Sequence, residues 1–228
     1  MAKISKNLQA SRAKVDADKF YELADAIKLA KEASYAKFDA TIDLAFNLNL
    51  DVRQADQQLR GAISLPHGTG KSVKVLAATD NAEQVKLAKE AGAEFVVAQE
   101  ELNEILSSGK FDFDIIITEP KMMPFFGRFG KILGPKGLMP NPKTGTVTPM
   151  VGKAVAEVKK GKANYRTDKN GIIHTIIGKA SMDDAKLLEN ALVVLDLIKK
   201  LKPSAVKGTY IQNFTVAATM GASVKVKL

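Results

Sequence analysis

The residues most suggestive of chemistry are Gly70-Lys71-Ser72, which end the stretch PHGTGKS and match the last positions of a nucleotide-binding loop. That loop has the form G-x-x-x-x-G-K-[ST], follows a strand and opens a helix, so that its backbone amides surround the phosphates. Here Leu65 occupies the position of the first glycine, and SVKVLAA downstream predicts a strand. We therefore interpret PHGTGK as a glycine-rich connection between domains, in which His67 has a structural hydrogen-bonding role.

The remaining residue types offer little else for catalysis. The chain has no cysteine, and its two histidines are His67 and His174, which excludes thiol catalysis, thiolate sites and a histidine-rich metal centre. No G-x-G-x-x-G follows the first strand of the α/β region, and no serine lies in a triad motif. The sequence thus predicts no catalytic residues, no metal, no cofactor and no enzymatic activity.

The net charge of +9 is concentrated in one segment of the 228 residues. Residues 120–169 hold eleven lysines and arginines against Glu157 and Asp168, and the rest of the chain is balanced. A concentrated basic field attracts polyanions. An anionic membrane is disfavoured as the partner because no basic amphipathic helix accompanies the charge. Nucleic acid is the favoured partner, and a solubilising cluster is the alternative.

Targeting and membrane segments are not evident. No apolar run approaches the ~18 residues needed to cross a bilayer. The first residues, MAKISKNLQASRAKVD, lack the apolar region of a secretory signal. We expect a cytoplasmic protein with no membrane partner.

The middle of the chain, residues 68–159, alternates strands with helices. Strands are predicted at 73–79, 93–98 and 114–118, and helices at 81–92 and 100–109. This order indicates a parallel sheet with helices on its faces, which is a Rossmann-like three-layer α/β domain. The glycine- and proline-rich residues 121–149 are expected to be mostly irregular, with one short helix.

The two ends of the chain carry an antiparallel pattern. Residues 38–48 alternate between apolar and polar side chains, as a half-buried strand does. Asn170–Gly171 separates two β-like runs, which is a strong hairpin signal. Residues 181–201 predict a helix with Ser181 as its N-cap.

These elements define the expected domains. Since a lone strand is not stable in water, the N-terminal strand must pair with strands near the C-terminus. Residues 1–67 and 160–228 therefore form a discontinuous antiparallel-sheet α+β domain, and residues 68–159 are the inserted α/β domain. Glycine near both crossings permits hinge motion, and the predicted hinge residues are Pro66, Gly68, Gly70 and Gly161.

The most distinctive stretch is GKILGPKGLMPNPKTGTV, a cationic loop without acids that three prolines stiffen. Such a loop can follow a phosphate backbone with little loss of chain entropy, so Lys131 and Lys136 are predicted as secondary phosphate contacts. Phe125, Phe126 and Phe129 lie just upstream. These rings either stack on bases or pack a short helix onto the α/β domain.

The same stretch resembles the signature of the bacterial type of large-subunit ribosomal protein L-one family. Further stretches that resemble the family are AKFDATID, RGAISLPHGTGK, AGAEFV, YRTDKNGIIH, IGKAS, KPSAVKGTY and TMGASV. They occur in the family's order and cover almost the whole chain. The resemblance implies two domains, the first built from both termini and the second an inserted α/β domain.

The resemblance also implies the function. Proteins like this are structural constituents of the large ribosomal subunit that bind 23S rRNA. They form a mobile stalk near the tRNA exit site, which assists release of deacylated tRNA. Bacterial members also bind a similar structure in their own operon mRNA and repress its translation. We expect these RNAs as partners, a ribosome-associated location, and a monomer when the protein is free.

The family's strongest RNA contacts fall, by motif, on residues of the first domain: Lys37, Phe38, Thr41, Asp168, Lys169, Thr219, Met220 and Gly221. Arg166 is added to this set from its charge, as a phosphate contact. The densest basic segment lies partly in the inserted domain, so its own role is an open question.

Several of these positions allow two interpretations. Phe38 lies on the apolar side of its predicted strand, so it either packs in the core or contacts RNA. Met220 is expected to be exposed between two strands, where a thioether suits an RNA minor groove. Asp168 either accepts from a 2′-hydroxyl or orients a neighbouring cation. Asn213 and Ala217 replace hydroxyl residues that are frequent in the family, so they are assigned no role.

Two other functions compete with a ribosomal role. One is a free translational regulator acting mainly on messenger RNA, which would use the same site. The other is an NTP-dependent enzyme using HGTGKS, which a failed ATP-binding test would remove.

Overall fold

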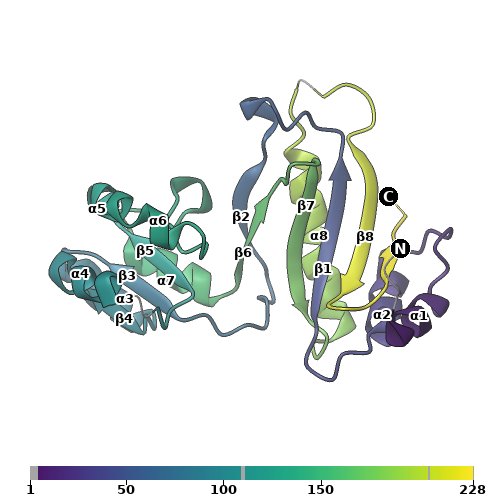
Figure 1. Cartoon of the computed structure of the whole chain (residues 1–228), viewed down its shortest axis with the longest axis horizontal. Coiled ribbons are helices and arrows are strands. Elements are labelled where there is room, and N and C mark those ends of the chain that lie inside the picture. The colour runs from purple at the N-terminus through teal and green to yellow at the C-terminus, as the bar shows by residue number, and fades with distance from the viewer. Residues whose placement is uncertain (1–4, 109–110, 205, 228) are drawn as a thin grey trace. The chain divides into compact units, whose positions relative to one another are not determined.

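A computed structural model describes residues 5–108, 111–204 and 206–227. The chain divides into two compact units (Figure 1): unit 1 comprises Met1–Lys71 and Ala163–Leu228, and unit 2 comprises Ser72–Lys162. Both crossings lie a few residues beyond the expected boundaries. Among the described residues, no helix combines the length and the apolar character that a membrane span requires.

Unit 1 is built on a four-stranded sheet in the order β7–β1–β8–β9. The strands are β1 (Thr41–Leu48), β7 (Ile172–Lys179), β8 (Ile211–Ala218) and β9 (Ser223–Lys225). Every pairing in it is antiparallel. The N-terminal strand β1 lies between two C-terminal strands, which satisfies the hydrogen-bonding edges that a lone strand would leave open.

Helices cover one face of this sheet. Along β1 the residues Ile42, Leu44, Phe46 and Leu48 are buried and alternate with half-buried neighbours. Phe46 stacks on Phe214 of β8 with ring centroids 4.4 Å apart. The core also includes side chains of α2 (Leu23–Ala33) and α8 (Asp184–Lys200). Figure 1 shows α8 behind the sheet and no helix in front of it.

The predicted hairpin forms its turn, but its strands separate. Gly171 has a φ of 80°, and the backbone N–H of Asp168 donates to the Ile172 carbonyl at 2.9 Å. Beyond the bridge between Thr167 and Ile173, strand β6 (Lys162–Arg166) leaves β7. It pairs instead with β2 (Arg60–Ser64), in a separate two-stranded sheet. The turn predicted at Asn170–Gly171 is therefore confirmed, whereas β2, the strand that pairs with β6, was not predicted.

Ser181 does not cap α8, contrary to the prediction. The helix begins at Asp184, and its N-cap is Asp183, which makes no side-chain capping bond. Ser181 instead donates its backbone N–H and its hydroxyl to the two carboxylate oxygens of Asp39, at 3.0 and 2.9 Å. Ser181 therefore holds the segment that leads into β1 in place, and it does not cap helix α8.

Unit 2 contains a parallel three-stranded sheet in the order β4–β3–β5. Its strands are β3 (Val75–Ala78), β4 (Phe95–Val97) and β5 (Ile115–Thr118). Its helices are α3 (Ala82–Glu90), α4 (Gln99–Ser108), α5 (Met123–Arg128), α6 (Gly130–Leu133) and α7 (Val151–Lys159). One core contains side chains of α3 and α7, and a second contains side chains of α4, α5 and α6. The fold class read from the sequence, an antiparallel α+β part and a three-layer α/β part, is confirmed.

Two details of unit 2 differ from expectation. Helix α7, whose residues Val151, Val155 and Val158 are buried, was not predicted from the sequence. The glycine- and proline-rich segment holds two short α-helices, α5 and α6, instead of one. Single turns of 3₁₀-helix complete the fold: Ala55–Gln57 (η1), Pro120–Met122 (η2) and Pro142–Thr144 (η3).

The first crossing between the units is anchored to unit 1. Asn190 of α8, which has no exposed surface, accepts from the His67 N–H at 3.2 Å. Its amide group donates to the carbonyls of Gly68 (3.0 Å) and Ile177 (2.7 Å). Gly70 follows, with a φ of 71°. At the second crossing, Gly161 ends α7 with a φ of 99°.

Candidate nucleic-acid interface

The uncovered face of the β7–β1–β8–β9 sheet, which we call the open face, presents mostly polar and small side chains in rows, with two isoleucines on β7. One row places His174, Ala45, Thr215 and Lys225 side by side on the four strands. The next row toward the start of β1 holds Ile176, Asp43, Ala217 and Ser223. On the other side of the His174 row lie Ile172, Asn47 and Asn213. This face offers hydroxyls, amides, cations and low side chains, so another molecule can approach its backbone closely.

Thr41 and Thr219 join two strands at one end of the open face. The N–H and the hydroxyl of Thr219 both donate to the Thr41 carbonyl, at 2.9 and 3.1 Å. The Thr41 N–H donates back to the Thr219 hydroxyl oxygen at 3.2 Å. The Lys179 ammonium donates to the Thr41 hydroxyl at 3.1 Å. The two predicted threonines are therefore neighbours, and Lys179 adds a cation that the sequence analysis did not include.

Lys37 and Phe38 lie on the segment that enters β1. Both side chains are exposed, and Phe38 has 55% of its surface accessible. Phe38 precedes the first residue of the strand, Thr41, so it has no place on the strand's apolar side. The interpretation of Phe38 as a core residue is wrong, and the structure leaves its ring available for contact.

The turn after β8 holds Met220 in an uncommon conformation. Met220 is the one non-glycine residue in the described part of the chain with a positive φ, 67°, and 57% of its surface is exposed. A β-carbon on Gly221 would lie 3.2 Å from the Ala218 carbonyl oxygen, so glycine fits the tight turn there. The turn therefore presents an exposed thioether beside Thr219, as predicted for Met220.

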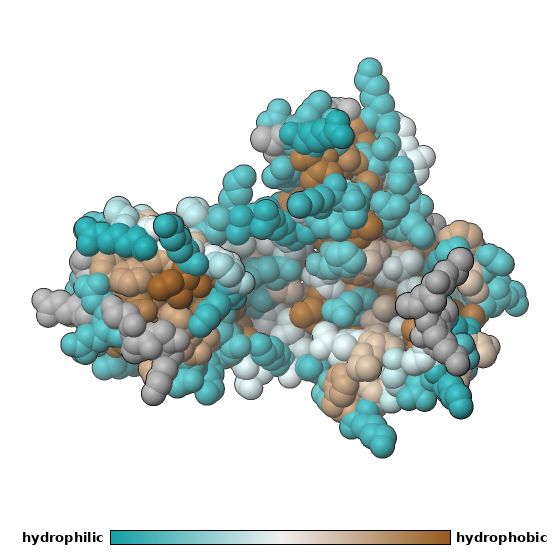
Figure 2. Space-filling model, in the orientation of Figure 1, coloured by the Kyte–Doolittle hydropathy of each residue, from teal (hydrophilic) through white to brown (hydrophobic). Residues whose placement is uncertain are grey.

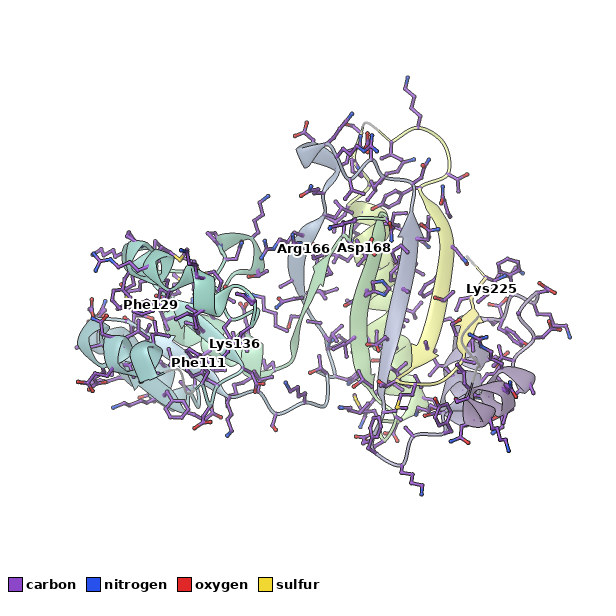
Figure 3. The ribbon with its side chains drawn as sticks, viewed as in Figure 1. Phe111, Phe129, Lys136, Arg166, Asp168 and Lys225 are labelled. Atoms are coloured by element: carbon purple, nitrogen blue, oxygen red, sulfur yellow. The ribbon has the colours of Figure 1, made fainter. Side chains whose placement is uncertain are left out.

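Strand β6 ends at Arg166, and the loop between β6 and β7 carries Asp168 and Lys169. This loop lies at the opposite end of β1 from Thr41, and Figure 3 labels Arg166 and Asp168. An open groove of about 740 Å³ runs between this loop and residues 50–53. Arg53 also lines the groove and is exposed. Figure 2 shows mostly hydrophilic residues over this end of unit 1. The groove presents three cations, and Arg53 is one that sequence reasoning missed.

Asp168 organises its own loop. One carboxylate oxygen accepts from the backbone N–H groups of Asn170 (2.8 Å) and Ile172 (2.9 Å). Two interpretations were drawn from the sequence, a 2′-hydroxyl acceptor or an orienter of cations. The observed bonds add a third role, because the carboxylate holds the turn that positions Lys169. An aspartate two residues before Asn-Gly is a known turn signal, so the sequence did contain the clue.

The turn makes stability depend on pH. Hydrogen bonds, chiefly from the Ile172 N–H, lower the pKa of Asp168 below its usual 3.8. A lowered folded-state pKa gives stability above pH 3.8 that is lost as the pH falls through the folded value. Replacing Asp168 by Ala should cost about 1 kcal/mol at pH 7, whereas Asn, which keeps an acceptor oxygen, should cost less. Thermal unfolding at pH 7 and at pH 3 measures this, and an equal loss at both pH values would contradict it.

The predicted RNA contacts form two groups that do not meet. One group lies around Thr41 and Met220, and the other lies around Asp168. β1 runs from Thr41 at one end to Leu48 at the other, a span of roughly 25 Å at ~3.3 Å per residue. The open face connects the two ends. An elongated partner that follows β1 would touch both groups, whereas a small ligand would touch one of them.

Asp43 is a half-buried carboxyl near the centre of the open face. Burial raises its pKa, and the nearby His174 and Lys179 partly oppose this rise. A carboxylate repels phosphate but accepts well from the N–H groups of bases. Asp43 and Asn47 were assigned no role from the sequence, although both are polar residues in an alternating strand. The alternating pattern shows only that these side chains point away from the core.

In unit 2, apolar residues of the cationic loop pack in one cluster with aromatic side chains. Phe125 and Phe126 are buried and Phe129 packs against the same cluster, so the packing interpretation is confirmed for these rings. The Lys136 ammonium lies 4.0 Å from the centroid of the Phe111 ring (Figure 3). Lys131 is exposed on α6. Both lysines are accessible from solvent, as secondary phosphate contacts must be.

The motif Gly70-Lys71-Ser72 does not have the geometry of a phosphate-binding loop. The chain after Gly70-Lys71-Ser72 enters β3 and opens no helix. The His67 ring pairs with Glu189 of α8 at 2.5 Å, so its predicted structural role is confirmed. Within residues 5–108, 111–204 and 206–227, no three His, Asp or Glu side chains gather as a metal site would require.

Comparison with known proteins gives a family match and similar relatives. The Ribosomal protein L1p/L10e family matches residues 29–222. The chain is 64% identical over 228 residues to the large ribosomal subunit protein uL1 of Mycoplasmopsis pulmonis (strain UAB CTIP), covering 100% of both chains. It is 60% identical over 227 residues to the protein of the same name from Mycoplasmopsis agalactiae (strain NCTC 10123 / CIP 59.7 / PG2), covering 100% of this chain and 98% of the relative.

The resemblance drawn from the motifs is thereby confirmed. The matched family consists of ribosomal proteins rather than enzymes, and the non-enzymatic prediction follows from that membership. The match includes β1, β8 and the turn at Met220, which carry one end of the open face. The chain belongs to the Ribosomal protein L1p/L10e family.

Proposed function

We propose that this chain is a structural constituent of the large ribosomal subunit, where it binds 23S rRNA through the open face of unit 1. The observation that carries the proposal is the end-to-end identity to relatives named large ribosomal subunit protein uL1. The open face supports it, because predicted contact residues lie at both ends of this uncovered face of the sheet. A double-stranded RNA helix presents a wide, shallow minor groove with 2′-hydroxyls, which suits this low polar surface.

The residues divide into three kinds of contact. Lys37, Lys169 and Arg166 are exposed cations and would bind phosphates. Phe38 and Met220 would lie against bases or sugars, since both are exposed and uncharged. Thr41, Thr219 and Gly221 would define the backbone shape at the sheet end, because their polar groups bond one another and the Ala218 carbonyl.

The finer roles follow from the same placement. We propose that the protein and its rRNA form the mobile stalk near the exit site, with the two units acting as separate domains. Because Asn190 fixes residues 67–68, Gly70 and Gly161 are the better hinge candidates than Pro66 and Gly68. Binding to exit-site tRNA and repression of its own operon mRNA are included in the proposal, since the mRNA would use the same face. A free regulator acting mainly on mRNA is the second candidate.

The test is binding of the purified protein to the stalk fragment of 23S rRNA across a salt series. We expect affinity orders of magnitude above that for an unrelated hairpin, and a log–log salt slope of roughly 0.7–0.9 per phosphate contact. Replacing Lys131 and Lys136 together by Ala should weaken binding. It should also lower the magnitude of that slope by the amount that about one to two phosphate contacts contribute. Equal, weak binding of both RNAs would contradict the proposed function.

Lys86→Ala is the matched control for the double lysine variant. Lys86 is an exposed lysine of α3 in the same unit, outside the basic segment, and its removal should leave the slope unchanged. An unchanged slope in the double variant would show that the basic loop does not contact this RNA. Copurification with large subunits separates the ribosomal role from a purely regulatory one.

A further inference from the structure

A second groove borders the open face at the end that carries Met220. It has a volume of about 620 Å³ and runs between α1 (Lys6–Ala13) and the turn from β8 to β9. Its lining includes Leu8, Arg12 and Val15 on one side, and Tyr35, Met220 and Ser223 on the other. Among the described residues that line it, none has an acidic side chain. None of the residues predicted from the sequence, apart from Met220 and Gly221, belongs to this groove.

A buried hydroxyl holds the two walls of the groove together. Ser11 of α1 is almost fully buried and donates to the Ala33 carbonyl at the end of α2, at 2.6 Å. The same oxygen accepts from the Ala222 N–H in the turn, at 3.0 Å. The Lys14 ammonium adds a bond to the Glu32 carbonyl at 3.0 Å. Because α1 is tied to both elements, the groove exists before any ligand binds.

Met220 supplies a strained and exposed part of the wall. A non-glycine residue at positive φ is energetically unfavourable, and such residues persist where the surrounding structure determines them. Here the Gly221 N–H donates to the Ala218 carbonyl at 2.8 Å, and Ser11 holds Ala222. The strain places a large apolar side chain at the border between the groove and the open face.

The chemistry of the walls fits one kind of ligand. Aliphatic, thioether and aromatic groups accept the flat face of an aromatic ring, and RNA bases stack on such surfaces when they leave a helix. Arg12 supplies a cation for the phosphate of the same nucleotide. The lack of acids disfavours a cationic ligand. Met220 and Gly221 belong both to the groove and to the predicted RNA contacts, so RNA on the open face would reach the groove.

We propose that this groove binds one unstacked RNA base, extruded from the RNA that lies on the open face. The inference rests on the proposed function and deepens it, because it adds a recognition pocket for a single nucleotide. Leu8, Val15 and Tyr35 would contact the base, Met220 would separate it from its neighbours, and Arg12 would contact its phosphate.

The test is a double-mutant cycle between the protein and the 23S stalk fragment. Abasic sites are introduced one at a time along the fragment, and affinity is measured for the wild-type protein and for Leu8→Ser and Tyr35→Leu. One abasic position should weaken wild-type binding by about tenfold, as loss of a base–aromatic stack does. The same abasic change should alter the affinity of either variant by less than about twofold, because its partner surface is already lost.

Leu192→Ser is the matched control, since Leu192 is an exposed leucine of α8 outside the groove. It should keep the full sensitivity to the abasic site, and thermal unfolding should show all variants folded. If every abasic site affects Leu8→Ser and Tyr35→Leu as it affects the wild type, the groove does not bind an RNA base. The proposed function would still stand in that case. If the wild type does not prefer the stalk fragment over an unrelated hairpin, both are overturned.

Discussion

Replacing Ala45 by Glu is expected to weaken binding of the protein to the stalk fragment of 23S rRNA by about 100-fold. Ala45 lies at the centre of the open face, in register with His174 on β7 and Thr215 on β8. A carboxylate there would stand between the two groups of contact residues and face the RNA. Like charges brought together across an interface cost several kcal/mol, and about 2.7 kcal/mol corresponds to 100-fold.

Ala45→Gln is the control that separates charge from size. It adds the same bulk without the charge, so its loss should be much smaller than that of Ala45→Glu. Neither substitution touches the core, because Ala45 points away from the buried side of β1, and thermal unfolding should confirm that both variants fold. Unchanged affinity in Ala45→Glu would show that the RNA does not cross the open face. Equal losses in the two variants would assign the effect to shape alone.

Replacing Asn190 by Ala is expected to destabilise unit 1 by about 3 kcal/mol. The side chain is fully buried and satisfies the His67 N–H and the Gly68 and Ile177 carbonyls. Each buried group left without a partner costs about 1–3 kcal/mol. At 2–4 °C per kcal/mol for a chain of this size, the melting temperature of unit 1 should fall by about 6–12 °C.

Calorimetry and hydrogen exchange measure this effect. The amide of His67 should exchange faster in the variant, because its acceptor is removed. Leu192→Ala, on the exposed side of the same helix, should change the melting temperature by about 1–2 °C at most. A melting temperature unchanged by Asn190→Ala would mean that the crossing segment is held by other contacts. That result would contradict the role of Asn190 as the anchor of residues 67–68.

The regular elements were predictable because their signals are local. The helix at Ala82–Glu90 has Asn81 as its N-cap, whose side chain accepts from the Glu83 N–H at 3.0 Å, and Gly92 follows with a φ of 88°. The alternation along Thr41–Leu48 gave its buried side correctly. Each of these features depends on a few neighbouring residues, so the order of residues alone specifies them.

Strand partners were harder to predict. Arg60–Ser64 is a short strand that contains glycine, and its partner Lys162–Arg166 is about a hundred residues away. Asn170–Gly171 correctly indicates a chain reversal after β6, but turn residues do not show how far the two strands stay paired beyond the turn. A β-carbon on Gly61 would lie 2.5 Å from the Tyr165 hydroxyl oxygen, so the Tyr165 side chain of β6 occupies the space beside this glycine of β2.

For this protein, the sequence by itself determined most of the regular elements, though not β2 or α7, together with the concentrated basic charge and, through its motifs, the family. It also pointed to contact residues at both ends of one sheet. Only the tertiary structure decided that helices cover one face of this sheet and leave the other open, that Phe38 is exposed, and that Asn190 anchors the first crossing. The physical reason is that exposure and hydrogen bonding depend on which distant segments pack together. Ser11 and Ala222, which hold one groove together, lie at opposite ends of the chain.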